Sequence, residues 1–497
     1  MFKRLSLEQF LEAARTEKRI AVYLEIPSDR ITPISVFEAL GEEAKGAMLL
    51  ESAVKEKERG RYSLLGFQPI ASLYSTGHSV TVISEGKSKV IDADPFGVLR
   101  EYFQKLRAKT LHPLSGFIGG TAGFVTYDAV RLFENIPDKN PDRLQLPDIY
   151  FKFYRHGIAF DNETNKAVIT TLVEVNDNAK ESYEQAIVVL EKIKNKILST
   201  STDRVTTLMP SIPAQKYTVS TENDEQDNTA YKAIIERAKH YITIGDIFQV
   251  VLSRPFYKKF TVKPFDIYRA LRFKSPAPYM FYLDYEDYQI VGASPERLVS
   301  VHSGIVRSSP LAGTRPRGSS PEQDDALAKE LLQNDKEIAE HMMLIDLTRN
   351  DVGAVSMPGK VLVKELLQVK KFSHVMHISS TIEGRLKDNL DAFDALRATF
   401  PAGTLSGAPK IRAMEIIDEL EEARRGLYGG AICNMNANGD LESCIAIRMA
   451  VLKDQVATVQ AGAGIVFDSE PDMEVAERRH KASTVLDAIA YAEERVI

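Results

Sequence analysis

Cysteine is scarce in this chain, long apolar runs and an excess of basic charge are missing, and each of these features excludes a class of protein. The two cysteines, Cys433 and Cys444, have neither the spacing of a metal knuckle nor the density of a disulfide scaffold, which fits a reducing compartment. No window reaches the roughly 18 apolar residues of a membrane-spanning helix, and residues 1–20 lack the apolar core of a signal peptide. We therefore expect a protein of the cytoplasm.

The charge balance argues against a nucleic-acid partner. The net charge is −6, and the 63 basic and 69 acidic residues are interspersed, so no basic tract forms an electrostatic footprint. The chain has 497 residues and is 44% hydrophobic, which is enough for a large core and for two or more domains or one unusually large domain.

Secondary-structure patterns predict an α+β fold in two regions. Short strand-like runs between turn residues dominate residues 1–198 and recur in residues 229–497, without a regular alternation of strand and helix, which favours mostly antiparallel pairing. Residues 199–228 are rich in Ser, Thr, Asp, Pro and Gln and lack periodicity, so we interpret them as a linker. In the first region, helices are expected at 33–40, 96–106 and 179–198.

Two pairs of glutamates stand three residues apart in stretches with helical periodicity. The first pair is Glu337 and Glu340, within residues 335–351, and the second is Glu474 and Glu477. This spacing places both carboxylates of a pair on one side of a helix, where they repel unless a proton, a cation or water separates them. Four carboxylates from two helices would suit Mg²⁺, although either pair alone is more often a solvated face.

Four single residues need an interpretation of their own. Arg448 lies in the apolar run CIAIRMAV, which we interpret as a strand, and a buried Arg there needs either an internal carboxylate or a bound anion. His377 is either a core His bonded to the backbone or a general base near neutral pH. In the 335–351 helix, we expect Met342 on the apolar stripe and His341 on the polar face beside the glutamates.

Glycine-rich turns recur in the second region. They expose backbone N–H groups with little side-chain bulk, which suits a carboxylate or a phosphate, but each could also be an ordinary turn. None matches the phosphate-binding P-loop or the dinucleotide fingerprint. The turns are LAGTRPRG at 311–318, GTLSGAPK at 403–410 and QAGAG at 460–464.

In their order along the chain, these and neighbouring motifs resemble those of the chorismate-utilising enzymes, and more closely the anthranilate synthase component I branch, the large, aminase subunit. The resemblance covers residues 231–489, and LLES (49–52) and RYSLLG (61–66) extend it into the first region. It implies mostly antiparallel sheets in a two-layered, sandwich-like body with helices outside. The motifs are GDIFQVVLSR (245–254), SPAPYMF (275–281), GASPE (292–296), PLAGTRPRG (310–318), EHMMLIDLTRND (340–351), HVMH (374–377), GTLSGAPK (403–410), YGGA (428–431), CIAIRM (444–449), QAGAG (460–464) and ERRHKA (477–482).

The resemblance implies a Mg²⁺ ion and a substrate with two carboxylates. Glu340 and Glu477 match the ligands of the ion, and Glu337 and Glu474 match groups that support it through water. The ion would neutralise the ring carboxylate of chorismate. The residues that match contacts to the substrate are Gly313, Thr314, Tyr428, Arg448, Gly462, Ala463, Gly464 and Lys481.

The implied reaction has two parts. Ammonia adds at C2 as the C4 hydroxyl leaves, and pyruvate is then lost as the ring becomes aromatic. Glu296 resembles the acid that protonates the departing hydroxyl, His377 resembles the group that serves the elimination, and Thr404 completes the expected catalytic set.

One position distinguishes members of the family. Relatives that use water or an enzyme amine as the nucleophile carry a lysine where this chain has Ala312, so ammonia itself is the expected nucleophile. Together with Thr404, this favours anthranilate formation. Two alternatives remain: an aminodeoxychorismate or aminodeoxyisochorismate synthase that stops before aromatisation, and a catalytically silent protein that senses tryptophan.

The resemblance also implies a partner and a regulator. Neither Cys433 nor Cys444 has the setting of a glutaminase nucleophile, so we expect a separate glutamine amidotransferase subunit in a heterodimer or heterotetramer. Where many relatives have Gly-Tyr, this chain has Cys433-Asn434, a change that would weaken or reshape feedback inhibition by tryptophan. The residues that match the tryptophan pocket are Glu51, Ser52, Pro278, Tyr279 and Met280.

Overall fold

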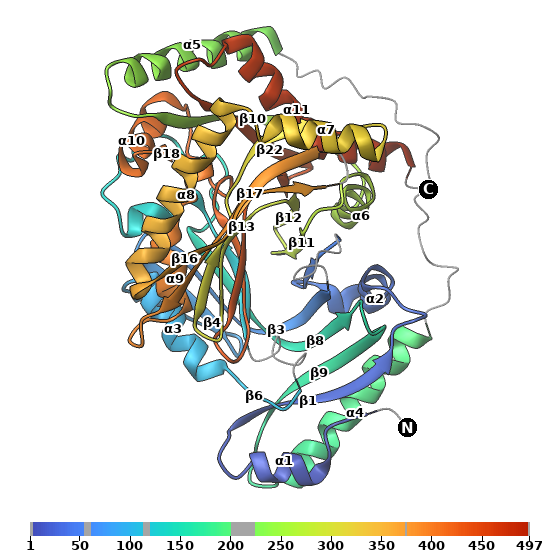
Figure 1. Ribbon diagram of the computed structural model, residues 1–497. Coiled ribbons are helices and arrows are strands. Elements are labelled where there is room, and N and C mark those ends of the chain that lie inside the picture. The colour runs from blue at the N-terminus through green and yellow to red at the C-terminus, as the bar shows by residue number, and fades with distance from the viewer. Residues whose placement is uncertain (1–2, 54–60, 113–119, 200–223, 373–374, 496–497) are drawn as a thin grey trace.

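Antiparallel strands joined into one hydrogen-bonded network form the framework of this protein (Figure 1). The structure is a computed structural model and describes residues 3–53, 61–112, 120–199, 224–372 and 375–495. Among the strand pairs it records, β1 with β6 is parallel and the long ladders are antiparallel. Helices cover the outside of the sheets, so the prediction of a mostly antiparallel α+β body is confirmed.

The first region is built around β8, which pairs with β3, β7 and β9. Helix α4 packs against β9 and β1 on one face of this sheet. The elements in order are α1 (Leu7–Ala13), β1 (Arg19–Pro27), α2 (Pro33–Leu40), β2 (Met48–Glu51), β3 (Tyr62–Thr76), β4 (Ser79–Ser84), β5 (Lys87–Asp92), α3 (Pro95–Leu106), β6 (Lys109–Thr110), β7 (Thr121–Val125), η3 (Tyr127–Leu132), β8 (Ile149–Asp161), β9 (Lys166–Glu174) and α4 (Ala179–Leu198).

The second region has two sets of strands. In one set β11, β12, β21, β22 and β10 pair in that order, and in the other β20, β13, β14, β17 and β16 do so. The strands are β10 (Gln249–Lys259), β11 (Tyr279–Asp284), β12 (Tyr288–Ser294), β13 (Arg297–His302), β14 (Ile305–Ser308), β15 (Leu311–Pro316), β16 (Ser356–Lys371), β17 (Val375–Leu386), β18 (Gly407–Ala408), β19 (Ala431–Met435), β20 (Leu441–Ile445), β21 (Met449–Lys453) and β22 (Val456–Ile465). The helices are α5 (Asp224–Thr243), α6 (Pro264–Lys274), α7 (Pro321–Leu331), α8 (Asp335–Val355), α9 (Ala392–Thr399), η5 (Gly403–Leu405), α10 (Lys410–Leu420) and α11 (Pro471–Arg495).

Two short strands of the first region join the sheets of the second. β2 pairs on one side with β3 and on the other with β11, and β7 pairs with β8 and with β19. The apolar core crosses the same boundary, because one cluster contains Phe151 of β8, Val299 of β13 and Leu396 of α9. The two regions therefore share both a sheet network and a core.

The three helices expected in the first region are present, and three differences from the predictions are informative. Helices α2 and α4 have the predicted bounds, and α3 begins one residue early, at Pro95. Residues 224–228, expected in the linker, already belong to α5, while residues 200–223 lie outside the described residues. On α8 the expected faces were wrong: His341 is fully buried against β17, and Met342 is 39% exposed.

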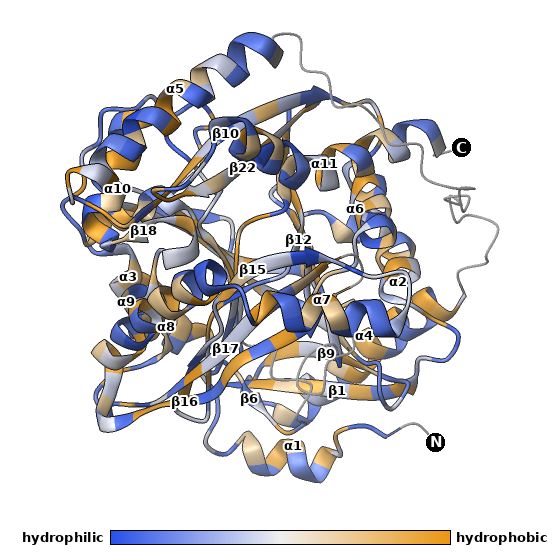
Figure 2. Cartoon of the chain, turned by 45° about the horizontal axis from the view of Figure 1, so that its top comes forward, coloured by the Kyte–Doolittle hydropathy of each residue, from blue (hydrophilic) through white to orange (hydrophobic). Residues whose placement is uncertain are grey.

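Hydropathy follows the layering. In Figure 2 apolar residues run along the strands, whereas the outer helices, such as α5 and α7, carry long polar stretches. No helix within the described ranges is long and apolar enough to cross a membrane.

Gly123, in the middle of β7, allows the close approach of β8. A Cβ placed on Gly123 would lie 1.9 Å from the carbonyl oxygen of Tyr150 and 2.7 Å from Cα of Phe151. We expect Gly123→Ala to lower the free energy of unfolding by about 3 kcal/mol or more, because backbone rather than a side chain must move. Urea denaturation followed by tyrosine fluorescence measures this loss.

Gly353→Ala is the matched control for that substitution. Gly353 lies in α8, and a Cβ there meets nothing within 4 Å, so alanine should leave stability unchanged or raise it by up to about 1 kcal/mol. Equal unfolding free energies for the two variants would contradict the assigned role of Gly123.

Candidate active site

A cavity of about 550 Å³ gathers most of the residues that the sequence singled out. Its walls come from segments far apart in the chain, including α8, α11, β10, β15, β22 and the η5 turn. Helix α11 packs against β22, and α8 packs against β15 and β17 (Figure 1). The predicted residues that line the cavity are Glu296, Gly313, Thr314, Glu337, Glu340, His377, Thr404, Tyr428, Arg448, Gly462, Gly464, Glu474, Glu477 and Lys481.

The two glutamates of helix α8 that line the cavity have different hydrogen-bond partners. Glu337 accepts a hydrogen bond from Nη1 of Arg315 at 2.9 Å. Glu340 accepts one from Nε2 of Gln249 at 3.0 Å, and burial, together with the charges of Glu337 and Glu477, raises the pKa of Glu340. A carboxylate in this position favours a cation or a proton beside it.

Helix α11 supplies the second acidic pair. Glu477 forms an ion pair with Nζ of Lys481 at 2.6 Å, one turn further along the helix. Burial and the charge of Glu477 raise the pKa of Glu474, although a hydrogen bond from Ser469 opposes this shift. The two predicted acidic pairs therefore face one cavity.

The donor set suits a hard cation that keeps water ligands. No three His, Cys, Asp or Glu side chains within the described residues are arranged to enclose a metal ion by themselves. Mg²⁺, however, is commonly held by one or two carboxylates and several waters. Its charge would offset the burial and the neighbouring carboxylates that raise the pKa of Glu340. The residues present fit that mode of binding.

Glu296 is a buried acid that is protonated over part of the neutral range. Its side chain is shielded from solvent, and desolvation raises its pKa to about 7. The hydroxyl of Thr404 donates to its Oε1 at 3.1 Å, and the N–H of Leu311 donates to the same atom at 3.3 Å. Such a carboxyl group can give a proton to a poor leaving group near pH 7.

His377 is kept neutral by its surroundings. Burial lowers its pKa to about 4. Its Nδ1 lies 2.9 Å from the carbonyl oxygen of Gly313. Because a carbonyl only accepts, Nδ1 carries the proton and Nε2 keeps its lone pair. The structure thus shows a His bonded to the backbone, and the role of His377 as a general base stays a prediction.

Arg448 lies between two strands, and the expectation that it lies within one was wrong. β20 ends at Ile445 and β21 begins at Met449, and Arg448 has a φ of 51°. Its Nη1 donates to the carbonyl oxygen of Lys481 at 2.9 Å and to the hydroxyl of Thr484 at 3.0 Å. Both acceptors are neutral, and burial lowers the pKa of the guanidinium, so an anion in the cavity would be stabilised.

Two of the glycine-rich segments expected as turns are strands instead: residues 311–316 form β15, and residues 460–464 lie in β22. They close the remaining wall of the cavity. Gly313 has a φ of 60°, and a Cβ there would lie 3.0 Å from Oε2 of Glu337, so a larger residue would crowd the acidic pair. Gly462 accepts from Nζ of Lys481 through its carbonyl oxygen at 3.0 Å. Ala463 differs from the expectation, because its N–H donates to the Tyr231 hydroxyl at 3.2 Å and the residue does not line the cavity.

Comparison with known proteins agrees with the geometry. The profile of the family described as "chorismate binding enzyme" matches residues 45–487. "Anthranilate synthase component 1" from Acetivibrio thermocellus is 42% identical over 98% of this chain and 99% of its own length, and that from Pseudomonas aeruginosa is 41% identical over 99% and 100%. The chain belongs to the anthranilate synthase component 1 family.

One solved structure supports this membership, and a more distant one shares the fold. Anthranilate synthase component I from Streptococcus pneumoniae TIGR4 superposes with a TM-score of 0.74 at 36% identity, covering 93% of this chain and 98% of its own. The menaquinone-specific isochorismate synthase from Escherichia coli has a TM-score of 0.69 at 20% identity, covering 97% and 98%, and shows the fold alone.

The residues predicted for a tryptophan pocket lie where β2 meets β11. Glu51 is buried, and its Oε2 accepts from the Tyr268 hydroxyl at 2.6 Å and from Nε of Arg272 at 3.0 Å. Met280 is its partner across the two strands, and Pro278 directly precedes β11. The structure thus brings together residues more than 200 positions apart.

Three further residues belong to this neighbourhood: Ser52, Tyr279 and Asn434. The Ser52 hydroxyl is buried and has no hydrogen-bond partner among the described residues. The Tyr279 hydroxyl donates to Oε1 of Glu442 at 2.6 Å. Glu442 faces Asn434 across β19 and β20, and the buried Oδ1 of Asn434 also lacks a partner within the described part. The unusual Asn434 therefore lies beside the contacts of Tyr279.

Sequence reasoning missed Gln249, the first residue of β10. It is 4% exposed, lines the cavity and donates to Glu340. A Cβ on Gly464 would lie 2.7 Å from its Nε2, so the glycine leaves room for this amide. A polar residue directly before the apolar run VVL was the available signal.

The raised pKa of Glu296 predicts a difference in stability between wild type and Glu296→Gln that depends on pH. A carboxyl group whose pKa is raised by folding holds its proton more tightly in the folded state, so its favourable contribution is complete below about 4.5 and is lost as the pH rises to about 7. We expect the stability of Glu296→Gln relative to wild type to increase over this interval by about 2–3 kcal/mol. Urea denaturation at pH 4.5, 6 and 8 measures it, and a difference independent of pH would contradict the shifted pKa.

Proposed function

We propose that this protein converts chorismate and ammonia into anthranilate and pyruvate in tryptophan biosynthesis. The observation that carries the proposal is the pairing, in one cavity, of a buried acid with a pKa of about 7, Glu296, and a neutral base, His377. Relatives named anthranilate synthase component 1 that match over nearly the whole chain support it.

Chorismate is a dicarboxylate, and the cavity has groups for both carboxylates. Arg448, Lys481 and the Tyr428 hydroxyl suit the enolpyruvyl carboxylate; burial raises the pKa of Tyr428 to about 12, so the hydroxyl stays protonated and can donate. Glu340 and Glu477 would hold Mg²⁺ directly, and Glu337 and Glu474 would support it through water. When bound, the ion supplies positive charge that anchors and neutralises the ring carboxylate.

The first half of the reaction needs an acid. Ammonia forms a bond to C2, the ring double bonds shift, and the C4–oxygen bond breaks. Glu296 gives its proton to the departing oxygen, which leaves as water, and the new ammonium group loses a proton. Thr404 keeps the carboxyl group in place through its hydrogen bond.

The second half needs a base. Nε2 of His377, which retains its lone pair, takes the proton from C2 as the C3–oxygen bond breaks, and the enolpyruvyl group leaves and takes up a proton to become pyruvate. Loss of that proton makes the ring aromatic, which separates this activity from an aminodeoxychorismate-type synthase.

The nucleophile comes from outside the chain. Ala312 lines the cavity at the position where relatives that use water or an enzyme amine carry a lysine, and a methyl group can neither activate water nor attack C2. Both cysteines are buried, and burial raises the pKa of each thiol, so neither suits a glutaminase. A separate glutamine amidotransferase subunit therefore supplies ammonia in this proposal, and high concentrations of free ammonia at alkaline pH replace it.

The decisive experiment is a fluorescence assay of the purified chain with chorismate, Mg²⁺ and ammonium salt at alkaline pH. We expect anthranilate emission that disappears with EDTA. Glu340→Gln should lower kcat/KM by at least about 100-fold, because it removes the charge that holds the cation. Glu184→Gln, an exposed glutamate on α4, serves as the control and should not change the rate.

Two results would contradict this proposal. Consumption of chorismate without anthranilate would favour a synthase that stops before aromatisation, and no consumption at all would favour a silent sensor. Unchanged turnover in Glu340→Gln would reject the metal assignment alone.

We also propose that tryptophan inhibits the enzyme at the meeting of β2 and β11. The buried carboxylate of Glu51 and the Ser52 hydroxyl, which has no partner among the described residues, suit the ammonium group of an amino acid. Glu51→Gln should raise the tryptophan concentration for half inhibition by at least about 10-fold, the loss expected for one charge-assisted hydrogen bond, and should leave the uninhibited rate unchanged.

Inhibition curves for wild type, Glu51→Gln and the exposed control Glu163→Gln provide the measurement, with melting temperatures recorded alongside. The assignment fails when Glu51→Gln and wild type give the same curve.

A further inference from the structure

A fully buried ion pair lies directly behind the cavity wall and is not part of the proposed chemistry. Arg425 is 2% exposed and Glu421 is 6% exposed. Nε of Arg425 donates to Oε2 of Glu421 at 3.0 Å, and Nη2 donates to Oε1 at 2.6 Å. The two side chains thus form a bidentate pair with little room for water.

The remaining donors of Arg425 bind two segments of the cavity wall. Nη1 donates to the carbonyl oxygen of Leu405 at 2.6 Å, and Nη2 also donates to that of Val251 at 2.6 Å. Leu405 and Val251 both line the cavity, and Leu405 directly follows Thr404, whose hydroxyl donates to Glu296. One guanidinium therefore connects η5 to β10.

Glu421 extends the same connection along β10. Its Oε1 accepts from the N–H of Ser253 at 2.8 Å and from the Ser253 hydroxyl at 2.9 Å. The hydroxyl in turn accepts from Nε2 of Gln460, another residue of the cavity wall, at 2.8 Å. The acid thus joins β10 to β22.

Arg425 also fixes the place of Tyr428. Its guanidinium lies 5.7 Å from the ring centre of Tyr428 and 4.6 Å from that of Tyr127. The N–H of Tyr428 donates to the carbonyl oxygen of Arg425 at 3.3 Å. Tyr428 also lines the cavity, so the guanidinium contacts the ring of a cavity residue.

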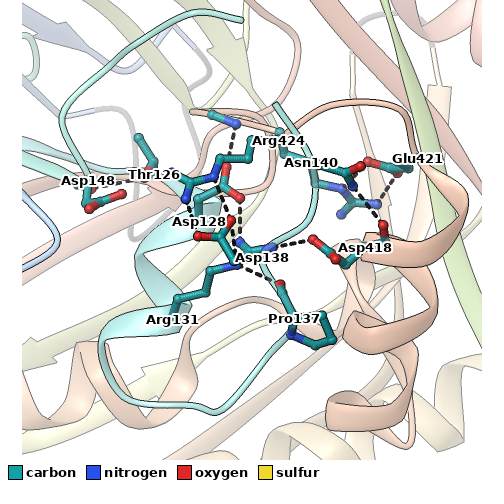
Figure 3. A network of polar contacts seen from close by, with 12 residues as sticks. Thr126, Asp128, Arg131, Pro137, Asp138, Asn140, Asp148, Asp418, Glu421 and Arg424 are labelled. Atoms are coloured by element: carbon teal, nitrogen blue, oxygen red, sulfur yellow. Dashed lines mark hydrogen bonds and ion pairs between the residues drawn. The ribbon is translucent and has the colours of Figure 1, made fainter. Parts of the chain in front are cut away.

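Residues of the first region also bind residues 424–426, the segment that contains Arg425 (Figure 3). Asp128 of η3 accepts from the N–H of Gly426 at 2.7 Å and from Nη1 of Arg131 at 2.6 Å, and Arg131 also binds Asp418 of α10 at 2.6 Å. Arg424 donates through Nε to Asp138 at 2.8 Å. The two residues that flank Arg425 in the chain, Arg424 and Gly426, are thereby bound to the first region.

We propose that Arg425 is a positioning residue for the reaction, acting through the Tyr428 hydroxyl. This inference rests on the proposed function, because it assumes that Tyr428 binds the substrate. A guanidinium can donate in one plane to Glu421, Leu405 and Val251 at once, whereas the compact ammonium of lysine cannot span all three. Arg425→Lys keeps the charge and removes this geometry.

A double-mutant cycle on chorismate turnover tests the proposal, with Arg425→Lys, Tyr428→Phe and the double variant. We expect each single substitution to lower kcat/KM by at least about 10-fold, and the double variant to lose far less than the product of the two losses, since both remove the same placed hydroxyl. Losses that multiply, or an unchanged kcat/KM in Arg425→Lys, would overturn the positioning role.

The control separates positioning from stability. Arg269→Lys alters another arginine, whose side chain is 9% exposed and which pairs with Asp266 and Glu38 away from the cavity. Its effect on kcat/KM should multiply with that of Tyr428→Phe, even where its melting temperature falls as far as that of Arg425→Lys. Where Arg425→Lys does not fold, Glu421→Gln takes its place in the same cycle with the same two outcomes.

The proposal and the proposed function fail in different ways. A wild-type chain that binds chorismate in calorimetry but forms no anthranilate overturns the function. The cycle is then measured on chorismate dissociation constants, where coupling between Arg425 and Tyr428 supports the positioning role and independence overturns it.

Discussion

Buried ionisable groups that lack a full counter-charge determine which ligands the cavity can bind. Arg448 is bonded to neutral oxygens, Glu340 to an amide, and Glu296 to a hydroxyl and an N–H. Each of these groups is held in an environment that disfavours its charged form. A ligand that brings two carboxylates and a divalent cation would satisfy both signs of charge at once. The fold therefore stores part of the recognition energy as electrostatic strain.

Several features of this cavity were predictable from the sequence because helical spacing and chemistry coincide. Glu337 and Glu340 at i and i+3 had to share a face, and the structure places them on one cavity with Glu474 and Glu477. The surroundings of His377 were not predictable, since burial keeps the ring neutral and the carbonyl of Gly313, 64 residues away, determines which ring nitrogen carries the proton. Spacing within one segment is local information, whereas burial and hydrogen-bond partners depend on the folded chain.

Other differences have the same physical origin. An apolar run around Arg448 indicated a continuous strand, but a left-handed residue splits it in two so that the side chain can reach α11. His341 had the polarity of a surface residue, yet it packs against β17 with Nε2 2.8 Å from the Ser380 hydroxyl. Gln249 gave no periodic signal because a single polar residue at the start of a strand is common. Periodicity identifies elements well and identifies breaks between them poorly.

The pairing of β7 with β19 has a consequence for how the protein is made. Residues 121–125 leave the ribosome about 300 residues before their partners at 431–435. At typical rates of about 5–20 residues per second, β7 waits for roughly 15–60 s with one edge unsatisfied. During this interval the nascent first region exposes a strand edge that other chains can pair with. Production of this protein is therefore sensitive to the speed of translation and to chaperones that cover open strand edges.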